Sequence, residues 1–151
     1  MCLVISKLDR LCLEMKLPPS YAYLKIKHTI EEINGILSDE SAKLNLDEKI
    51  DYLLSPILGN VIFSCSEYGF FFSLKTFAEN YTKNMSRLRP EVFQKVLWGN
   101  FYFDKDSKKF LRKKKNSGMK RAFVEFILEP LYKIMGHTVS FEKENLEPVL
   151  R

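Results

Sequence analysis

The chain has 151 residues, of which 46% are hydrophobic and 13% aromatic, and it carries a formal net charge of +5. That is enough apolar material for one packed domain but too little for two generous ones. Apolar stretches such as 61–63 and 69–72 fall far short of the roughly 20 residues of a membrane span, so we expect a soluble globular chain with no membrane partner.

The apolar N-terminus predicts a short buried strand over 3–5. It has neither a basic leader nor a small-residue cleavage site, so a signal peptide is disfavoured. The strand runs directly into a polar loop, 6–10. Because open α/β sheets place ligand contacts in loops at the carboxyl ends of strands, this loop is a candidate binding segment.

A helix is predicted over 20–38, with Ser20 as its N-cap after two prolines. Its apolar side chains recur at helical spacing on one face, and its charged residues lie elsewhere, so it should cover a sheet on one side only. Those apolar positions are Ile26, Ile30, Ile33 and Leu37. The polar residues 39–52 that follow predict an insertion or a loosely ordered connector.

A second strand is predicted over 61–63, because these residues are β-branched and aromatic and are followed by the small residues 64–66. It repeats the arrangement of a strand that ends in a polar loop. Further along, Ser73 is suited to cap a helix over 74–81, and Pro90 is suited to the first turn of a shorter one.

Segments 101–103 and 109–112 flank a turn-rich spacer and predict an antiparallel hairpin. The stretch 105–121 holds nine basic residues and one acidic residue, a local net charge of +8. Such a block can attract a nucleic-acid backbone or an acidic protein surface, and the alternative is a solvated loop. The candidate contacts to RNA or to a protein partner are Arg112, Lys113, Lys114 and Lys115.

The last predicted helix begins near Lys120 and contains Pro130 in its interior. A proline there lacks a backbone donor and clashes with the carbonyl four residues earlier, that of Phe126. The sequence therefore predicts a kink or a break between two helices.

The cysteines and histidines form no recognisable site. Three cysteines at irregular spacing match neither a disulfide framework nor a zinc site, which fits a reducing compartment. The two histidines have no partner arranged for metal binding or nucleophile activation, so we expect no catalytic residue and no metal site. These residues are Cys2, Cys12, Cys65, His28 and His137.

The tetrapeptide Ser6-Lys7-Leu8-Asp9 resembles the Asn-Lys-x-Asp guanine-recognition motif of GTPases. A carboxylate such as that of Asp9 can accept hydrogen bonds from both N1 and N2 of guanine, a pair of donors that adenine lacks. The stem of Lys7 can lie along the base while its ammonium stays polar. Ser6 departs from the motif, because one hydroxyl replaces an amide, and one lost neutral hydrogen bond costs about 0.5–1.5 kcal/mol.

The second predicted strand also ends in a loop that resembles a guanine-binding segment. In GTPases, the next strand of the sheet ends in a small-residue loop whose backbone N–H groups approach the O6 atom of guanine. The resemblance implies that Cys65 and Ser66 supply these groups. A backbone contact tolerates a change of side chain, so the Cys65 thiol need not be reactive.

Longer segments, spread over nearly the whole chain, resemble the spliceosomal relatives of elongation factor 2, which are GTPases of the U5 small nuclear ribonucleoprotein. These segments are 16–19, 28–35, 54–56, 59–61, 97–99 and 123–134. Elongation factor 2 itself shares the first strand, the guanine loop, the Leu-Trp-Gly segment and a related final helix. It lacks the Pro-Pro pair and the Leu-Ser-Pro-x-Leu-Gly-Asn segment, so the spliceosomal family is the better match.

The resemblance implies an α/β fold: the C-terminal half of a P-loop GTPase G domain of the translation-factor type over 1–69, with an inserted α+β subdomain over 70–151. It also implies GTP or GDP as ligand and a nuclear role in pre-mRNA splicing, in spliceosome activation and disassembly. The implied partners are U5 small nuclear RNA, a large scaffold protein and an RNA helicase.

The sequence contains no Gly-x-x-x-x-Gly-Lys-[Ser/Thr] phosphate loop, no Asp-x-x-Gly and no magnesium-binding switch. We therefore expect that the chain alone does not hydrolyse GTP, and that magnesium would be bound by a part that this sequence lacks. We expect the chain to be a fragment, a partial gene model or a degenerate copy. Two alternatives stay open: a fragment of an elongation factor 2-type translation GTPase, and a basic module that binds RNA or protein without nucleotide chemistry.

Overall fold

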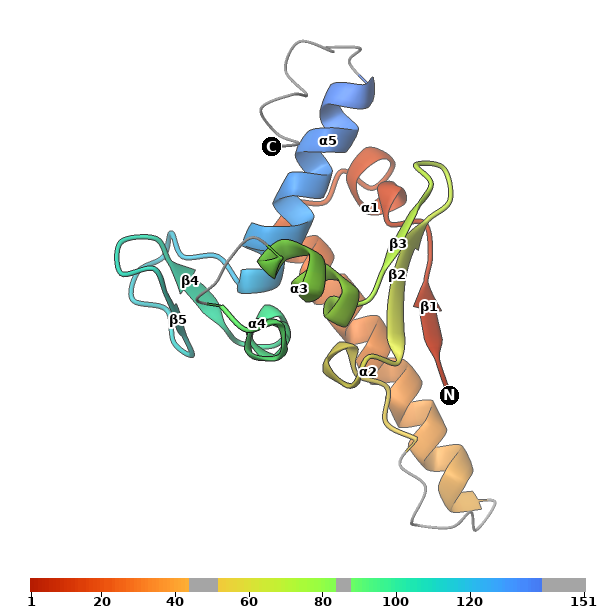
Figure 1. Cartoon of the computed structure of the whole chain (residues 1–151). Helices are drawn as coiled ribbons and strands as arrows, with labels where there is room; N and C mark the ends of the chain where they lie inside the picture. The colour runs from red at the N-terminus through yellow and green to blue at the C-terminus, as the bar shows by residue number, and fades with distance from the viewer. Residues whose placement is uncertain (44–51, 84–87, 140–151) are drawn as a thin grey trace.

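The structure, a computed structural model, describes residues 1–43, 52–83 and 88–139 (Figure 1). Helices and strands alternate along much of the chain, which confirms the predicted α/β class at the level of a mixed fold. In chain order the elements are β1 (Leu3–Ile5), α1 (Asp9–Leu13), α2 (Pro19–Lys43), the 3-10 helix η1 (Pro56–Leu58), β2 (Val61–Cys65), β3 (Phe70–Phe72), α3 (Leu74–Thr82), α4 (Pro90–Leu97), β4 (Tyr102–Asp104), β5 (Lys109–Leu111), the π-helix η2 (Val124–Leu128) and α5 (Glu129–Val139).

The main sheet has three strands in the order β1-β2-β3. β1 runs parallel to β2, with Leu3 opposite Val61, and β3 runs antiparallel to β2, with Phe70 opposite Cys65. β4 and β5 form a separate antiparallel hairpin, which confirms that prediction. The sequence pattern did not predict β3, because three consecutive phenylalanines show no alternation and become a strand through pairing with β2.

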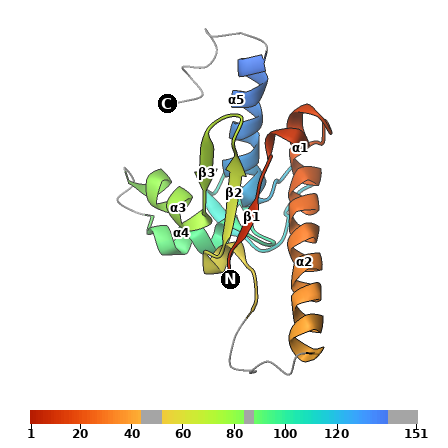
Figure 2. The same ribbon diagram turned by 90° about the vertical axis from the view of Figure 1, so that its right-hand side faces the viewer.

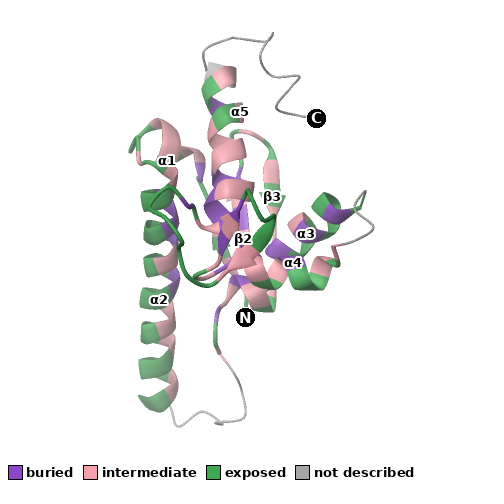
Figure 3. Ribbon diagram, turned by 90° about the vertical axis from the view of Figure 1, so that its left-hand side faces the viewer, coloured by how far each residue is buried: buried purple, intermediate pink, exposed green. Residues whose placement is uncertain are grey.

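One face of the main sheet carries the core. Val61, Phe63 and Cys65 alternate along β2 and are fully buried. The Phe63 ring lies 5.3 Å from that of Phe123 and 6.2 Å from that of Trp98, measured between centroids. The buried residues of α2 and of the C-terminal helix line this same interior in Figure 3.

A single tyrosine connects α2 to the chain after α4. The buried Tyr23 hydroxyl donates to the Gly99 carbonyl at 3.2 Å and accepts from the Gly99 N–H at 3.1 Å. Its ring lies 5.0 Å from that of Trp98. The polar tip of a core aromatic residue thus has both of its hydrogen bonds satisfied.

The other face of the sheet is open. Val4 on β1 is 55% exposed and Phe71 on β3 is 78% exposed, and Figure 2 shows these strands in front of α5. The prediction of a buried strand over 3–5 is therefore wrong for Val4. β1 is an edge strand, and the helices pack on the opposite face of its sheet.

The helix α2 is longer than predicted. It begins at Pro19, whose fixed φ suits a first helical position, so Ser20 lies within the first turn instead of at the cap. It buries Ile26 and Ile30 as predicted and continues to Lys43, which contacts Glu40 at 2.6 Å. Residues 39–43 are therefore helical, and 44–51 of the predicted connector lie outside the described residues.

The final helix is continuous. The chain is helical from Ala122 to Val139, so of the two outcomes predicted at Pro130, a kink or a break between two helices, the break is wrong. A π-helical turn, η2, stands immediately before the proline, where the Glu129 N–H bonds the Val124 carbonyl five residues earlier. This wider turn lets a helix continue where the regular hydrogen-bond pattern is interrupted. No helix within the described ranges is long and apolar enough to cross a membrane.

Two asparagine side chains hold the residues that lead into β2: Asn34 from α2, and Asn60 from the position just before β2. The Asn34 amide donates to the Leu54 carbonyl and accepts from the Leu54 N–H, both at 2.8 Å. The Asn60 amide likewise donates to the Leu53 carbonyl and accepts from the Ser55 N–H, both at 2.8 Å. Each side chain satisfies two backbone groups that no strand or helix pairs.

We predict that Asn34→Ala lowers the free energy of unfolding by about 1–3 kcal/mol, because it leaves the N–H and C=O of the buried Leu54 without partners. Urea denaturation followed by circular dichroism measures the loss. Asn80→Ala, at an exposed position on α3, is the control and should change the stability much less. Equal losses of unfolding free energy in the two variants would show that the Asn34 hydrogen bonds make no specific contribution to stability.

Candidate functional site

The parallel pairing of β1 and β2 brings the two predicted guanine loops together. Both strands end at the same edge of the sheet, where the Leu8 N–H bonds the Ser64 carbonyl at 3.4 Å. At this edge the Cys65 thiol donates to Asp9 Oδ1, with Sγ and Oδ1 2.9 Å apart. Residues 56 positions apart in the sequence are therefore in direct contact.

The residues of the first loop differ in exposure. Ser6 and Lys7 are exposed, Asp9 is half-buried, and Leu8 is buried beneath them. Lys7 has a φ of 59°, in the left-handed region that non-glycine residues occupy at a cost of roughly 1–2 kcal/mol. The buried Leu8 and the hydrogen bond from its backbone hold this conformation, which leaves the Lys7 side chain outside the core.

The chain enters α1 immediately after the loop. Asp9 is the first residue of this short helix, and the Arg10 N–H bonds the Lys7 carbonyl at 3.1 Å. Residues 6–10 were predicted to be a polar loop, because the five residues of this helix are too few for a periodic pattern. Because α1 packs against α5, the backbone of Asp9 is supported from the far end of the chain.

Asp9 retains accepting capacity. A carboxylate offers about four lone-pair sites, and the thiol occupies one of them on Oδ1. Within the part of the chain that the structure describes, Oδ2 has no hydrogen-bond or ion-pair partner. A bound molecule with two adjacent N–H donors would therefore find two accepting oxygens in a fixed orientation.

The second loop places its side chains differently. Cys65 is buried and Ser66 is exposed. Burial raises the pKa of the Cys65 thiol, and its hydrogen bond to Asp9 raises that pKa further. Both effects favour the neutral thiol over the thiolate, which is the form that acts as a nucleophile.

The site contains two features that sequence reasoning missed. One is the side-chain contact from Cys65 to Asp9, since only a backbone role had been predicted for Cys65. The other is Tyr68, whose pKa is raised by burial and by the negative charge of Asp9 nearby. Neither has a local sequence signal, because both depend on which strand ends meet.

No group of three or more metal-ligating side chains occurs among the described residues. His28 is exposed and lies 3.5 Å from Glu32 one helical turn away. It is a surface residue.

No protein-family model matches the chain. Pre-mRNA-splicing factor cwf10 of Schizosaccharomyces pombe is 42% identical to it over 145 residues, which cover 96% of the chain and 14% of that protein. The 110 kDa U5 small nuclear ribonucleoprotein component CLO of Arabidopsis thaliana is 41% identical over 148 residues, which cover 97% of the chain and 15% of that protein. The chain belongs to this family of U5 components. It spans only about one seventh of their length.

A more distant relative is elongation factor-like GTPase 1 of Mus musculus. It is 27% identical over 179 residues, which cover 98% of the chain and 16% of that protein. The greater identity to the U5 components confirms the choice of the spliceosomal family over an elongation factor relative.

The basic stretch of this U5-family segment is partly occupied by contacts within the fold. Lys115 Nζ lies 2.5 Å from Asp104 Oδ2, and Lys105 Nζ lies 2.7 Å from Glu125 Oε1. Lys120 pairs with Glu129. Lys115, one of the four predicted partner contacts, is thus committed to an internal ion pair.

The other three predicted contact residues have no carboxylate partner among the described residues. The Arg112 guanidinium lies 5.7 Å from the centre of the Phe101 ring, and Lys114 Nζ lies 5.4 Å from that of Tyr102. Lys113 is exposed and has no ion pair among the described residues. The structure therefore divides the block into cations that pair with carboxylates of the fold and cations that have no such partner among the described residues.

We predict that Lys115→Gln raises the pKa of Asp104, which hydrogen bonds from Lys115 and Ser107 lower to about 2. A depressed carboxyl pKa stabilises the fold above the unfolded value of 3.8, and this contribution is lost as the pH falls toward 2. Carbon-detected NMR titration of the Asp104 carboxyl measures the change. Lys113→Gln is the control, and an equal rise in both variants would contradict the assignment.

We predict that Cys65 is alkylated by iodoacetamide more slowly than the exposed Cys2, because Cys65 is buried and its thiol pKa is raised. Asp9→Asn should accelerate Cys65 alkylation severalfold relative to Cys12, because it removes the carboxylate that raises the thiol pKa. Peptide mass spectrometry follows each cysteine, with Asp106→Asn as a charge-matched control. An unchanged Cys65 rate in Asp9→Asn would argue against the thiol–carboxylate contact.

Proposed function

We propose that the chain is a guanine-recognition segment of an elongation factor 2-like GTPase that acts in pre-mRNA splicing. In this proposal, residues 1–69 are the C-terminal half of a P-loop G domain and 70–151 are its inserted subdomain. The observation that carries the proposal is the contact of Asp9 with Cys65 at the joined ends of two parallel strands. Ligand contacts of open α/β sheets lie at such strand ends.

Asp9 selects the base in this proposal. Guanine presents an N1–H and an N2 amino group side by side, and a carboxylate accepts from both. Adenine has an acceptor at N1 and no amino group at C2, so it would face the carboxylate with repulsion and an unpaired oxygen. Because the Cys65 thiol donates a hydrogen bond to Oδ1, the Asp9 carboxylate is already oriented before a base binds.

The remaining guanine contacts come from both loops. The backbone N–H groups of Cys65 and Ser66 approach O6, and the aliphatic stem of the exposed Lys7 covers the base. Ser6 supplies a hydroxyl where an asparagine amide would offer both a donor and an acceptor. Affinity is therefore lower than with an asparagine, while base choice remains with Asp9.

GTP or GDP is the proposed ligand of the longer protein, and phosphate binding, magnesium binding and hydrolysis are assigned to no residue of this chain. The names of the relatives, a pre-mRNA-splicing factor and a U5 small nuclear ribonucleoprotein component, support a nuclear role in splicing. The proposed partners are U5 small nuclear RNA, a large scaffold protein and an RNA helicase. Co-precipitation of ribosomal RNA in place of U5 RNA with the endogenous protein would favour a translation role.

We predict that guanosine shifts the backbone amide NMR signals of residues 6–9 and of Cys65 and Ser66 in the 15N-labelled chain, and that adenosine does not. Asp9→Asn should lose the guanosine response and gain one to xanthosine, because an amide N–H donates to the C2 carbonyl of xanthine. Asp106→Asn removes the same charge in the exposed β4–β5 turn and should respond as the parent chain does. An undiminished preference for guanosine in Asp9→Asn would refute the role of Asp9.

A further inference from the structure

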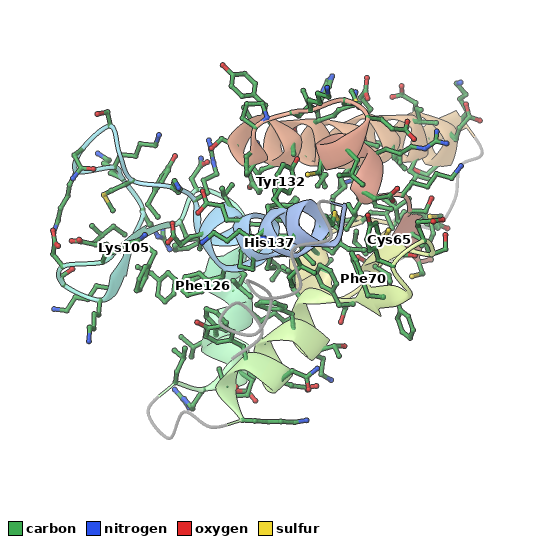
Figure 4. The ribbon with its side chains drawn as sticks, turned by 90° about the horizontal axis from the view of Figure 1, so that it is seen from above. Cys65, Phe70, Lys105, Phe126, Tyr132 and His137 are labelled. Atoms are coloured by element: carbon green, nitrogen blue, oxygen red, sulfur yellow. The ribbon has the colours of Figure 1, made fainter. Side chains whose placement is uncertain are left out.

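The β4–β5 hairpin and the loop that follows it form an arm at one end of the molecule. In Figure 1 this arm lies away from the main sheet, and in Figure 4 Lys105 on the arm and Cys65 in the candidate guanine site lie at opposite ends. A ligand of the arm would therefore not compete for space with a nucleotide at Asp9.

Three acidic side chains, one on the arm and two on the C-terminal helix, are already neutralised. Asp104 is paired with Lys115, Glu125 with Lys105, and Glu129 with Lys120. The hydrogen bond with Glu125 also raises the pKa of Lys105. These three carboxylates are therefore not available to pair with the cations further along the arm.

Five cations on the arm have no carboxylate partner among the described residues, and we call them the cationic edge. They lie on the turn, on β5 and on the loop after β5, and all of them are exposed. They are Lys108, Lys109, Arg112, Lys113 and Lys114.

Aromatic rings of the arm hold two members of the cationic edge. Arg112 lies over Phe101 and Lys114 lies over Tyr102, each within 6 Å of the ring centre. Such contacts restrict a long side chain without neutralising its charge, so less conformational entropy is lost when an anion binds.

The surface of the arm is nearly devoid of apolar anchors. Exposed large hydrophobic side chains occur on several described elements, for example Phe71 on β3 and Val92 on α4, but none lies in the fully described range 99–121. Protein–protein interfaces have an apolar or aromatic centre that is depleted in lysine. Interfaces with nucleic acids are instead polar and strongly positive.

We propose that the cationic edge binds the phosphodiester backbone of a nucleic acid. Exposed cations that have no carboxylate partner among the described residues, and no exposed apolar side chains beside them, can neutralise phosphates but cannot form the centre of a protein interface. Binding is independent of base sequence, because the contacts are made by ammonium and guanidinium groups to phosphates. The inference stands apart from guanine recognition, which involves other residues at the other end of the molecule.

The test uses the triple variant Lys108→Gln/Lys109→Gln/Lys113→Gln. These three side chains have no ion pair or ring contact in the described structure, so the fold should be preserved. Fluorescence anisotropy measures the binding of labelled oligouridine and oligothymidine between about 50 and about 200 mM salt. The slope of log affinity against log salt concentration should become shallower by roughly two for both, since each phosphate contact on a single strand contributes about 0.7.

The matched control is Lys25→Gln/Lys75→Gln/Lys95→Gln, which removes the same charge from exposed positions on α2, α3 and α4. It should leave the salt slope nearly unchanged. An equal effect of the two triple variants would overturn the proposal, because it would indicate attraction by net charge alone. Preferential binding of poly-glutamate would assign the cationic edge to an acidic protein instead, and a loss confined to one of the two nucleic acids would refute backbone recognition.

Discussion

The parallel pairing of β1 with β2 is the contact on which the candidate site depends. It sets Ile5 opposite Phe63, so the chain leaves both strands at the same edge of the sheet, and only this register brings the Cys65 thiol to Asp9. Because side chains alternate along a strand, a slip of one residue would turn Cys65 away from the core and remove the contact. Phe63 of β2 anchors this pairing in the core, because its ring packs against those of Phe72, Trp98 and Phe123.

That shared core also bears on how the proposed parts of the chain relate to one another. The proposed boundary between 69 and 70 falls in the turn between β2 and β3, which are hydrogen-bonded to each other. On either side of it, Tyr23 and Phe63 pack against Trp98 and Phe123. Two parts that share one set of buried rings are expected to unfold together, so the proposed inserted subdomain is a structural extension of the first part and not a separate folding unit.

Electrostatics divides the basic stretch by function. Three lysines neutralise carboxylates of β4 and of the C-terminal helix, and their loss would cost internal hydrogen bonds. The cationic edge has no such partners in the part of the chain that the structure describes, and it is the surface proposed to bind an external anion. Neighbouring lysines in the sequence, Lys113 and Lys115, thus have different roles because of what lies opposite each of them.

The sequence by itself determined the elements whose signals are local. It predicted the periodic stripe of α2, the cap at Ser73, the hairpin at the basic stretch, and Asp9 and Cys65 as residues at strand ends, and its longer segments indicated the family. The tertiary structure alone decided β3, α1, the contact between Cys65 and Asp9, and the pairing of Lys115 with Asp104. Each of these depends on residues that are distant in the chain or on segments shorter than one hydrophobic period. The exposure of Val4 was also decided by the tertiary structure, since an apolar strand is buried only where another layer covers its face.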